Sequence, residues 1–469
     1  MIAFLLAGAA ALADPGARPA GAMTLQRCIE IALKENLELK IARAELARAQ
    51  GARTGSLGKF LPAVTLTASE QRSTEREATL VGLNRVETRT TFETQELTAT
   101  VSQELPSGAI VDVTHLAGPD QKKPSDTRSR GIEATLTQPL LKGAGLAVSL
   151  AGVRSSGWDV RARELDLNDL ERQTVRGVKV AYYNVLRDRE LLRVNRSTLD
   201  ADSLLVQASN AMVEAKVASR RDVLSARIRL SDDATSVVVA ERDEQLSLDL
   251  LKNVMGVPLE TPIEVADLKL EAKGVPLDEA ALIRSVIETH PAIQSARFGV
   301  KRSRLDLTVA RNATLPQIDL QASYLGSLEQ SAPSDEIRGK GWLAAVNVHY
   351  PLFDRAAVGA ARERDAALSQ AEDRLKQLER ELTLRVRDIV RTVRSSSEEV
   401  QAIQRTIEAA DEKMQFATAM FNLGRASNLD ITDARGDLVK ARTQLVKKLV
   451  DYNSQLALLE SLTGKPVGP

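Results

Sequence analysis

The chain has 469 residues, of which 63 are Lys or Arg and 63 are Asp or Glu, so it carries no net charge when its histidines are neutral. This balance gives no reason to expect a nucleic-acid or other polyanionic partner. Aromatic residues make up only 3 % and hydrophobic residues 43 % of the chain, which suits helices with narrow apolar seams better than a large globular core. The single cysteine, Cys28, excludes an intramolecular disulfide, and we expect it to be a small buried residue of a helix.

The chain begins with a short apolar run that ends in Ala11-Leu12-Ala13. Such a run is typical of a secretory signal peptide, although basic residues are missing from its start. We predict cleavage after Ala13, which removes residues 1–13. The run is too short to span a bilayer as an anchor. Cys28 lacks the small preceding residues of a lipoprotein signal, so we expect export without a lipid anchor, and no later segment has the hydrophobicity of a membrane-spanning helix.

A helix and a β segment come next. Apolar residues recur at helical spacing from Thr24, a candidate N-cap, to about residue 57. In the β segment, residues 62–138, apolar and polar residues alternate in four short stretches, at 64–68, 97–101, 109–113 and 132–136. We expect four strands there, with polar loops over residues 70–91 and 118–130.

A helical hairpin, residues 146–256, follows the β segment. Its long helix is predicted to end near residue 215, and its shorter return helix begins at Ser219 or Arg220. The linker after it, up to residue 275, reads as irregular with one short strand.

The second part of the chain again starts with a helix, residues 278–313, in which Pro291 is either tolerated or produces a kink. Its β segment, residues 316–350, predicts two strands, at 318–324 and 342–350, on either side of a polar loop at 326–341.

A second hairpin, residues 356–464, contains no proline, so nothing there must break a helix. Its apolar residues are spaced by three and four with one four-residue skip, the pattern of a coiled-coil stripe with a stutter. The stripe runs through Leu368, Ala371, Leu375, Leu378, Leu382, Val386, Ile389, Val393, Val400, Ile403, Ile407, Ala410, Met414, Ala417 and Phe421. Gly424 interrupts it, and Ser427 or Asn428 can cap a returning helix.

The two halves of the chain repeat one another, which is the strongest signal in the sequence. The segment from Asp222 to Arg227 aligns with the segment from Asp430 to Arg435. The same offset aligns Met212 with Met420, Ser219 with Ser427, Gly256 with Gly464 and Pro258 with Pro466. We therefore divide the chain after the leader into a first repeat, residues 14–275, and a second repeat, residues 276–469, each with a helix, a β segment and a hairpin.

The predicted lengths indicate how these elements fit together. At ~1.5 Å per residue, each long helix is on the order of 100 Å, and a short first helix and a return helix together have about that length. Two short helices stacked end to end can therefore run beside each long one. The strands have the length of tilted membrane strands but are fewer than the ~8 of the smallest membrane barrels. A barrel would have to be shared between copies; the alternative is a soluble β domain that buries each apolar face.

With these features the chain resembles the TolC-like outer-membrane efflux proteins over nearly everything after the leader. The resemblance rests on the duplicated architecture, on the strand entries Leu61-Pro62 and Leu315-Pro316, on Thr137-Gln138-Pro139-Leu140-Leu141, and on the tip Leu423-Gly424-Arg425 followed by Leu429-Asp430-Ile431-Thr432-Asp433-Ala434. It implies a mainly α fold with a β-barrel part: a homotrimer with a β-barrel shared in the lipid of the outer membrane and a helical barrel across the periplasm. It also implies hairpin tips that form a closable entrance and dock a periplasmic adaptor protein, which is coupled to an inner-membrane transporter.

The chain departs from the familiar form in two places. The first β segment has alternation for four strands where the familiar form has two, so either the barrel is wider or one hairpin lies outside it. In addition, Gly424 of the second tip aligns with Lys216 of the first. Adaptor contact at the first tip, through Lys216 and Val217, need not therefore follow the pattern expected at Leu423, Gly424 and Arg425.

Asp430 and Asp433 are the candidate gate residues. Because they are spaced i, i+3, both can point from one helix face, and the resemblance places them in a ring at the periplasmic entrance that favours cations. In a trimer they would set six carboxylates around one constriction; the alternative is an acidic first turn stabilised by the helix dipole. Asp222 holds the matching position in the first repeat, where it is either a solvated surface residue or a member of a polar latch with Arg227 or Arg425.

Nothing in the sequence indicates catalysis. His115, His290 and His349 are far apart without metal-binding spacing, and glycine-rich phosphate loops are absent. We expect no enzyme activity, no cofactor and no nucleic-acid partner. The prediction is a passive duct of a tripartite efflux or secretion system, which conducts substrates from a periplasmic entrance to the exterior. The alternative is a periplasmic coiled-coil adaptor or scaffold, which usually carries one hairpin and not two.

Overall fold

The structure, a computed structural model, describes residues 22–81, 84–119, 128–216, 219–331, 335–423 and 425–466. The predicted signal peptide lies outside these residues. The chain divides into two compact units, one with the sheet (residues 43–166 and 291–379) and one with the hairpins (residues up to 42, 167–290 and 380–469). Each sequence repeat contributes to both units, so the units do not coincide with the repeats.

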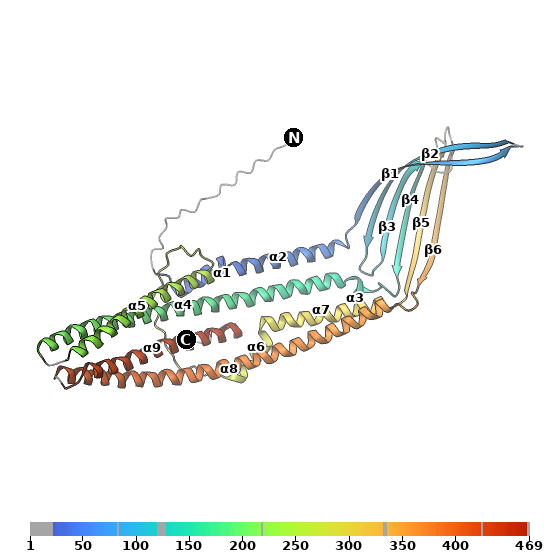
Figure 1. The fold of residues 1–469 in the computed structure, drawn as a ribbon. Coiled ribbons are helices and arrows are strands. Elements are labelled where there is room, and N and C mark those ends of the chain that lie inside the picture. Colours follow the sequence, from blue (N-terminus) through green and yellow to red (C-terminus); the bar gives the residue numbers. More distant parts are fainter. Residues whose placement is uncertain are drawn as a thin grey trace. The chain divides into compact units, whose positions relative to one another are not determined.

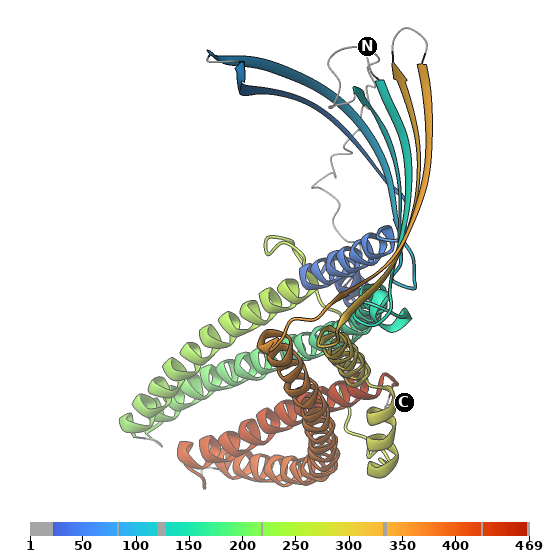
Figure 2. The same ribbon diagram turned by 90° about the vertical axis from the view of Figure 1, so that its right-hand side faces the viewer.

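The sheet unit contains six strands in one antiparallel sheet, and every strand pairs with its neighbours in chain order. Figure 2 shows the strands side by side in one curved sheet. They are β1 (Ala63–Val81), β2 (Asn84–Glu104), β3 (Ile110–Pro119), β4 (Arg128–Pro139), β5 (Gln317–Ser331) and β6 (Asp335–His349). The six strands predicted in the two β segments are all present, whereas the short strand expected in the linker is reduced to a single bridge between Met23 and Val265.

The loops between these six strands, in contrast, are shorter in the structure than the sequence predicts. Residues 70–91 and 326–341 are expected from the sequence as loops, but most of them continue the strands, with Ser73 opposite Phe92 and Leu325 opposite Gly341. These segments carry polar residues at successive positions, so their two faces do not differ and the period-two signal disappears. Residues 120–127, in the other predicted loop, lie outside the described part of the chain.

The register places most apolar residues of the six strands on one face of the sheet. The partners in one row of pairs are Val64, Val101, Val113, Ala134, Tyr324 and Trp342. The opposite face is mostly polar, and there the hydroxyls of Thr100 and Thr114 lie 3.2 Å apart. The apolar face is open in the single chain, where Trp342 is 81 % exposed.

The helices of this unit pair as the predicted lengths require. α2 (Leu37–Gly58) lies along the first part of α4 (Ala151–Glu214), where the hydroxyls of Ser56 and Ser156 are 2.8 Å apart. α7 (Pro291–Ala313) lies along the first part of α8 (Arg355–Asn422), where Arg311 donates to Asp365 at 2.9 Å. A one-turn helix, α3 (Leu146–Ser149), precedes α4.

Three predicted helices are divided in the structure. The long helix expected from residue 146 divides into α3 and α4 at Leu150. The first helix divides into α1 (Leu25–Glu35) and α2 at Asn36, whose side chain accepts the backbone N–H of Leu39 (3.1 Å) and donates to the carbonyl of Val254 (2.8 Å). These side-chain bonds replace the helical bonds lost at the break. Of the two outcomes expected at Pro291, the structure shows the break: the helix over 278–313 divides into α6 (Glu279–Thr289) and α7 at His290, because proline favours the first position of a new helix.

The hairpin unit holds two helical hairpins, which Figure 1 shows at the ends of the green and the red segments. The first joins the second part of α4 to α5 (Arg220–Met255), and the other joins the second part of α8 to α9 (Asn428–Thr463). The predicted stripe of α8 is buried here, at Leu382, Val386, Ile389, Val393, Val400, Ala410, Ala417 and Phe421. Among the described residues no helix is long and apolar enough to cross a membrane.

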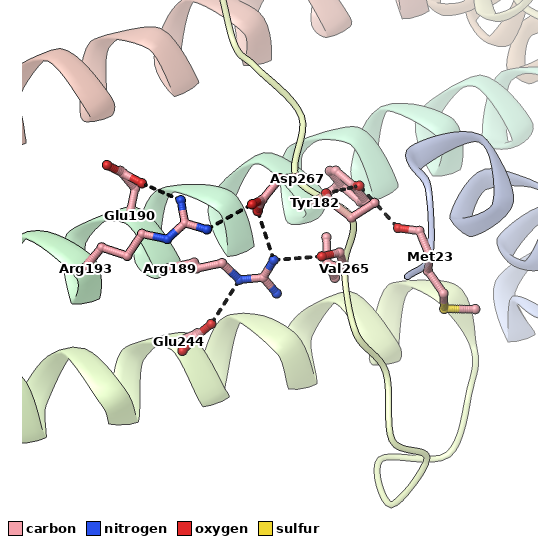
Figure 3. Close-up of polar contacts among 9 residues, drawn as sticks. Met23, Tyr182, Arg189, Glu190, Arg193, Glu244, Val265 and Asp267 are labelled. Atoms are coloured by element: carbon pink, nitrogen blue, oxygen red, sulfur yellow. Dashed lines mark hydrogen bonds and ion pairs between the residues drawn. The ribbon is translucent and has the colours of Figure 1, made fainter. Parts of the chain in front are cut away.

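The irregular linker after α5 is held against α4 by its backbone (Figure 3). Val265 forms a parallel bridge with Met23, and the Tyr182 hydroxyl donates to the carbonyl of Met23 at 3.2 Å. Arg189 donates to the carbonyl of Val265 (2.7 Å) and to Asp267 (3.2 Å). Beneath the linker lies an apolar core of Cys28, Ala32, Val178, Ala181, Tyr182, Tyr183, Val185, Leu251, Met255, Val265 and Val450. The prediction for Cys28 is confirmed, since it is fully buried and its burial raises the thiol pKa to about 11.

Candidate functional site

The two hairpin tips begin their return helices in the same way. At α5, the backbone N–H of Ser219 donates to Asp222 at 3.0 Å, and at α9 that of Ser427 donates to Asp430 at 2.7 Å. Each serine hydroxyl in turn accepts a backbone N–H of the first helical turn, which completes a capping box at both sites. Ser427, and not Asn428, is therefore the N-cap of α9. The duplication seen in the sequence extends to individual hydrogen bonds.

The return helices also end alike. Gly256 and Gly464 both take the left-handed conformation, with φ of 72° and 69°. A side chain at Gly256 would place its Cβ 2.6 Å from the carbonyl oxygen of Glu35. Glycine is therefore required at Gly256 by backbone conformation and by close packing together.

Asp430 and Asp433 both lie on the exposed side of the second tip. The hydrogen bond from the Ser427 backbone, followed by that from its hydroxyl (2.8 Å), lowers the pKa of Asp430, which keeps this carboxylate ionised. Asp433 binds Lys413 of α8 at 2.6 Å, and Lys413 also binds Asp437 at 2.7 Å. These two carboxylates raise the pKa of Lys413. The tip thus presents three carboxylates within two helical turns and one lysine that two of them share.

The remaining predicted contact residues of the tips are exposed where the structure describes them. Leu423 is an exposed apolar side chain, and the backbone N–H of Arg425 donates to Met420 at 2.9 Å. Lys216 has a positive φ of 61°, so a lysine takes a conformation that favours glycine at the position aligned with Gly424. Gly424 and Val217 lie outside the described residues.

A polar cluster that the sequence did not reveal connects the two hairpins near their tips. Arg435 of α9 forms an ion pair with Asp202 of α4, and these side chains are only 16 % and 7 % exposed. Asp233 of α5 lies beside them, where burial, a hydrogen bond with Asp202 and the charge of Asp202 raise its pKa to about 6. The nearby amide of Asn428 donates to the hydroxyl of Ser209 at 2.6 Å. Three helices of two hairpins therefore meet at one arginine and two carboxylates.

Sequence reasoning missed this cluster because the partners of Arg435 do not follow the repeat. Arg227 holds the matching position in the first hairpin and is exposed. The only signal available was the alignment of these two arginines. Asp222 contacts Ser219 in its capping box, and its part in a latch with Arg227 or Arg425 stays a prediction.

The apolar residues beneath the cluster come from both hairpins as well. Leu205 of α4 packs with residues of α8 and α9, namely Ala417, Phe421, Ile431 and Ala434. Within the described parts of the chain, no group of three or more His, Cys, Asp or Glu side chains is placed to hold a metal ion.

Two long helical hairpins in tandem and a sheet with one apolar face define an outer-membrane channel protein with a periplasmic helical part. The family model "Outer membrane efflux protein" matches residues 28–257 and 282–465, and the chain belongs to this family. The resemblance, the mainly α fold class with a β part and the outer-membrane location are thereby confirmed. Members of this family are channels, which agrees with the duct and not with the adaptor alternative.

The similarity to named relatives is low in sequence identity but extends over most of this chain. The chain is 23 % identical to the pyoverdine export outer membrane protein OpmQ of Pseudomonas aeruginosa, over 73 % of this chain and 75 % of OpmQ. It is 24 % identical to the toluene efflux pump outer membrane protein TtgC of Pseudomonas putida, over 62 % of this chain and 60 % of TtgC. With the protease secretion protein PrtF of Dickeya chrysanthemi it shares 24 % identity, over 67 % of this chain and 68 % of PrtF.

Solved structures share the fold at lower identity. The outer membrane protein VceC of Vibrio cholerae matches 94 % of this chain and 96 % of its own, with a TM-score of 0.69 and 15 % identity. The CmeC outer membrane channel of Campylobacter jejuni matches 94 % of this chain and 85 % of its own, with a TM-score of 0.69 and 15 % identity.

Proposed function

We propose that three copies of this chain form one passive duct from the periplasm to the exterior. Each copy contributes its sheet to a barrel shared in the lipid of the outer membrane and its two hairpins to a helical barrel in the periplasm. The sheet supports this assembly, because β1 and β6 stand at its two edges and one of its faces is apolar. Conduction through such a duct requires no catalytic step by the chain.

The hairpin tips are the proposed periplasmic entrance, with Asp430 and Asp433 as its gate. The observation that carries this proposal is the geometry of the second tip. There the capping box fixes the start of α9, and the two carboxylates stay exposed on its first turns. In a trimer these residues would form a ring of six carboxylates, which binds cations at a constriction. Asp222, in the matching capping box of the first tip, is the third proposed gate residue.

The tips are also the proposed contact surface for a periplasmic adaptor protein coupled to an inner-membrane transporter. Exposed Leu423, Arg425 and Lys216 support this assignment, and Gly424 and Val217 complete the two proposed contact sites. The names of the relatives refer to pyoverdine export, toluene efflux and protease secretion. We infer that this chain is the outer-membrane component of an export system of that type.

Divalent-cation block of single channels in planar bilayers tests the gate. The double variant Asp430→Ala, Asp433→Ala should need about tenfold more Mg²⁺ for half-block, because the loss of all six carboxylates from one ring removes most of its attraction for cations. Unchanged block in this variant would contradict the gate assignment.

Two further variants separate charge from structure. Ser427→Ala removes the hydroxyl of the same capping box but keeps both carboxylates, so its block should match the unaltered channel. Asp222→Ala measures the share of the first repeat: weaker block places Asp222 in the ring, and unchanged block leaves it as a capping residue only.

A further inference from the structure

We propose that all six strands of the sheet, the β1–β2 hairpin included, belong to the membrane wall, so that three copies close a barrel of eighteen strands. This inference rests on the proposed trimeric duct. It decides between the two outcomes that the long first β segment leaves open, a wider barrel or a hairpin outside it.

The first argument is the continuity of the apolar face. The β1–β2 hairpin is joined to β3 by a ladder of paired residues from Leu97–Ala117 to Glu104–Ile110. Across this ladder apolar residues stay in register in the row Val64, Val101, Val113, Ala134, Tyr324 and Trp342, and in the pair of Leu97 with Ala117. In the row between them Leu66 pairs with Ala99, which faces His115 of β3. If both faces of the hairpin were in water, its apolar residues would not be expected to align with those of the neighbouring strands.

The second argument is the exposure of these residues. Val64 is 67 % and Leu66 72 % exposed, as much as Val346 and Val348 at the far edge of the sheet, at 61 % and 66 %. Among the residues that the structure describes in the sheet unit, none therefore covers the apolar face of β1 more than that of β6. A contiguous apolar face that is exposed on a single chain marks a surface that contacts another apolar phase.

The third argument is the stagger of the apolar band across the sheet. On β1 the band runs from Val64 to Ala68. On β6 it runs from Trp342 to Val348 and continues to Tyr350. At one end of the band, Val64 lies in the same row as Trp342, which is about six residues from the end of the band at Val348. At the other end, Ala68 lies in the same row as Arg338, which is about four residues from the end of the band at Trp342.

This stagger gives the tilt of the strands. A shift of four to six residues is roughly 13–20 Å along the strands, and it accumulates over about 24 Å across five strand spacings. The band is therefore level when the strands tilt by roughly 30–40°, close to the ~35–45° of membrane barrels. The band is level only if β1 and β2 follow the same tilt as the other strands, as strands of one wall do.

The remainder of the hairpin is polar and continues past the band. From Ser69 to Val81 and from Asn84 to Glu96, β1 and β2 pair with each other beyond the last β2–β3 pair, Leu97–Ala117. The hairpin therefore divides at that level into a membrane part and a two-stranded ribbon outside the bilayer.

The number of strands sets the diameter of the proposed β-barrel. At ~4.8 Å between strands and a tilt of ~40°, eighteen strands give a circumference of about 110 Å and a diameter of about 35 Å. Twelve strands, from two strands per β segment, would give about 24 Å at the same tilt. The wall facing this lumen carries mostly hydroxyl, amide and carboxyl groups, such as Thr67, Thr98, Asp112, Thr135, Gln321 and Asn347. Its apolar members include Ala63, Leu116, Leu325, Leu343 and Ala345.

Single cysteines in a Cys28→Ala background test the placement of the hairpin. Leu66→Cys and Ala99→Cys lie on the apolar face of β1 and β2, and Thr67→Cys and Thr98→Cys lie on the opposite face. Ala344→Cys and Ala345→Cys form the matched pair on β6. Each variant is purified as folded protein, reconstituted in phosphatidylcholine vesicles, and treated with a membrane-impermeant maleimide.

The expected result is labelling about tenfold slower at the three apolar-face cysteines than at their partners, because lipid excludes the reagent there. Equal labelling of both faces in β1 and β2, with the difference kept on β6, overturns the eighteen-strand barrel and leaves the duct intact. Equal labelling on β6 as well overturns the membrane barrel itself. A strand count by electron cryomicroscopy of the detergent-purified protein gives a second measurement: eighteen strands support the proposal, and twelve contradict it.

Discussion

The return helices of the two hairpins begin and end in the same way, but the charges near their tips differ. Both return helices start in a Ser–Asp capping box and end at a left-handed glycine. The first tip carries Lys216 and begins its helix with Arg220 and Arg221, whereas α9 carries Asp430, Asp433 and Asp437 in its first three turns. The duplicated sequence has thus kept the residues that fix the chain direction, and the exposed side chains have diverged. This difference indicates that the two return helices start in the same way but present different charges.

The largest expected effect concerns two arginines at matching positions. Arg435→Ala leaves Asp202 buried without its ion-pair partner, which should destabilise the protein by about 3–5 kcal/mol. Arg227→Ala removes an exposed side chain at the same repeat position and should cost at most about 0.5 kcal/mol. Thermal unfolding at one protein concentration compares the two variants.

A rescue variant makes this test specific. Replacing both partners, with Asp202→Leu and Arg435→Met, should restore most of the stability, since a buried ion pair can be exchanged for apolar packing. Equal losses for Arg435→Ala and Arg227→Ala would show that the hairpins are not joined at this cluster.

A smaller effect should follow from Asp233 in the same cluster. Its pKa is about 6 in the folded protein against 3.8 for an ordinary aspartate. The folded state therefore holds a proton that the unfolded state has released, so this group stabilises the fold at low pH and its contribution is lost as pH rises from about 4 to 6. Asp202, Arg435 and Asp232 are the charged groups that act on it.

Unfolding followed across this pH range checks the prediction. Asp233→Asn should flatten the fall in stability between pH 4 and 6, whereas Asp232→Asn, at the exposed neighbouring position, should leave most of it. The prediction is wrong if both variants keep the slope of the unaltered protein.

The two N-caps should have equal effects, in contrast to the two arginines. Ser219→Ala and Ser427→Ala each remove one side-chain acceptor at a helix start, at a cost of about 1 kcal/mol. Hydrogen exchange of the first turns of α5 and α9 would detect the loss at each tip. A loss at only one tip would mean that the capping geometry is not equivalent in the two repeats.

The smallest expected effect is at the first tip. Lys216→Gly should stabilise the turn by at most about 1 kcal/mol, because glycine takes a positive φ without steric cost. Lys216→Val should destabilise it, since a branched side chain resists this conformation. Limited proteolysis at the tip ranks the three proteins, and cleavage of the glycine variant faster than the valine variant would contradict the assignment.

The elements with a regular spacing of apolar residues could be predicted from the sequence. The outer limits of the helices, the six apolar strand cores and the duplicated tips were predicted, because each depends on local spacing that one pattern describes. The family resemblance rested on the same landmarks and is confirmed by the family match. The gate role of Asp430 and Asp433 stays a prediction, although their place at the tip is as expected.

Other features depended on the tertiary structure. The polar halves of β1 and β2 look like a loop because strand pairing in a two-faced polar ribbon comes from backbone hydrogen bonds, which leave no period in the side chains. The break at Asn36 depends on a side-chain hydrogen bond to the distant carbonyl of Val254, whereas the break at His290 was one of the two outcomes expected at Pro291. The cluster of Asp202, Asp233 and Arg435 joins residues distant in the sequence, and no local pattern contains such a contact. The sequence by itself thus determined which elements form, and the tertiary structure decided which charges become buried together, because burial depends on neighbours that the chain order does not name.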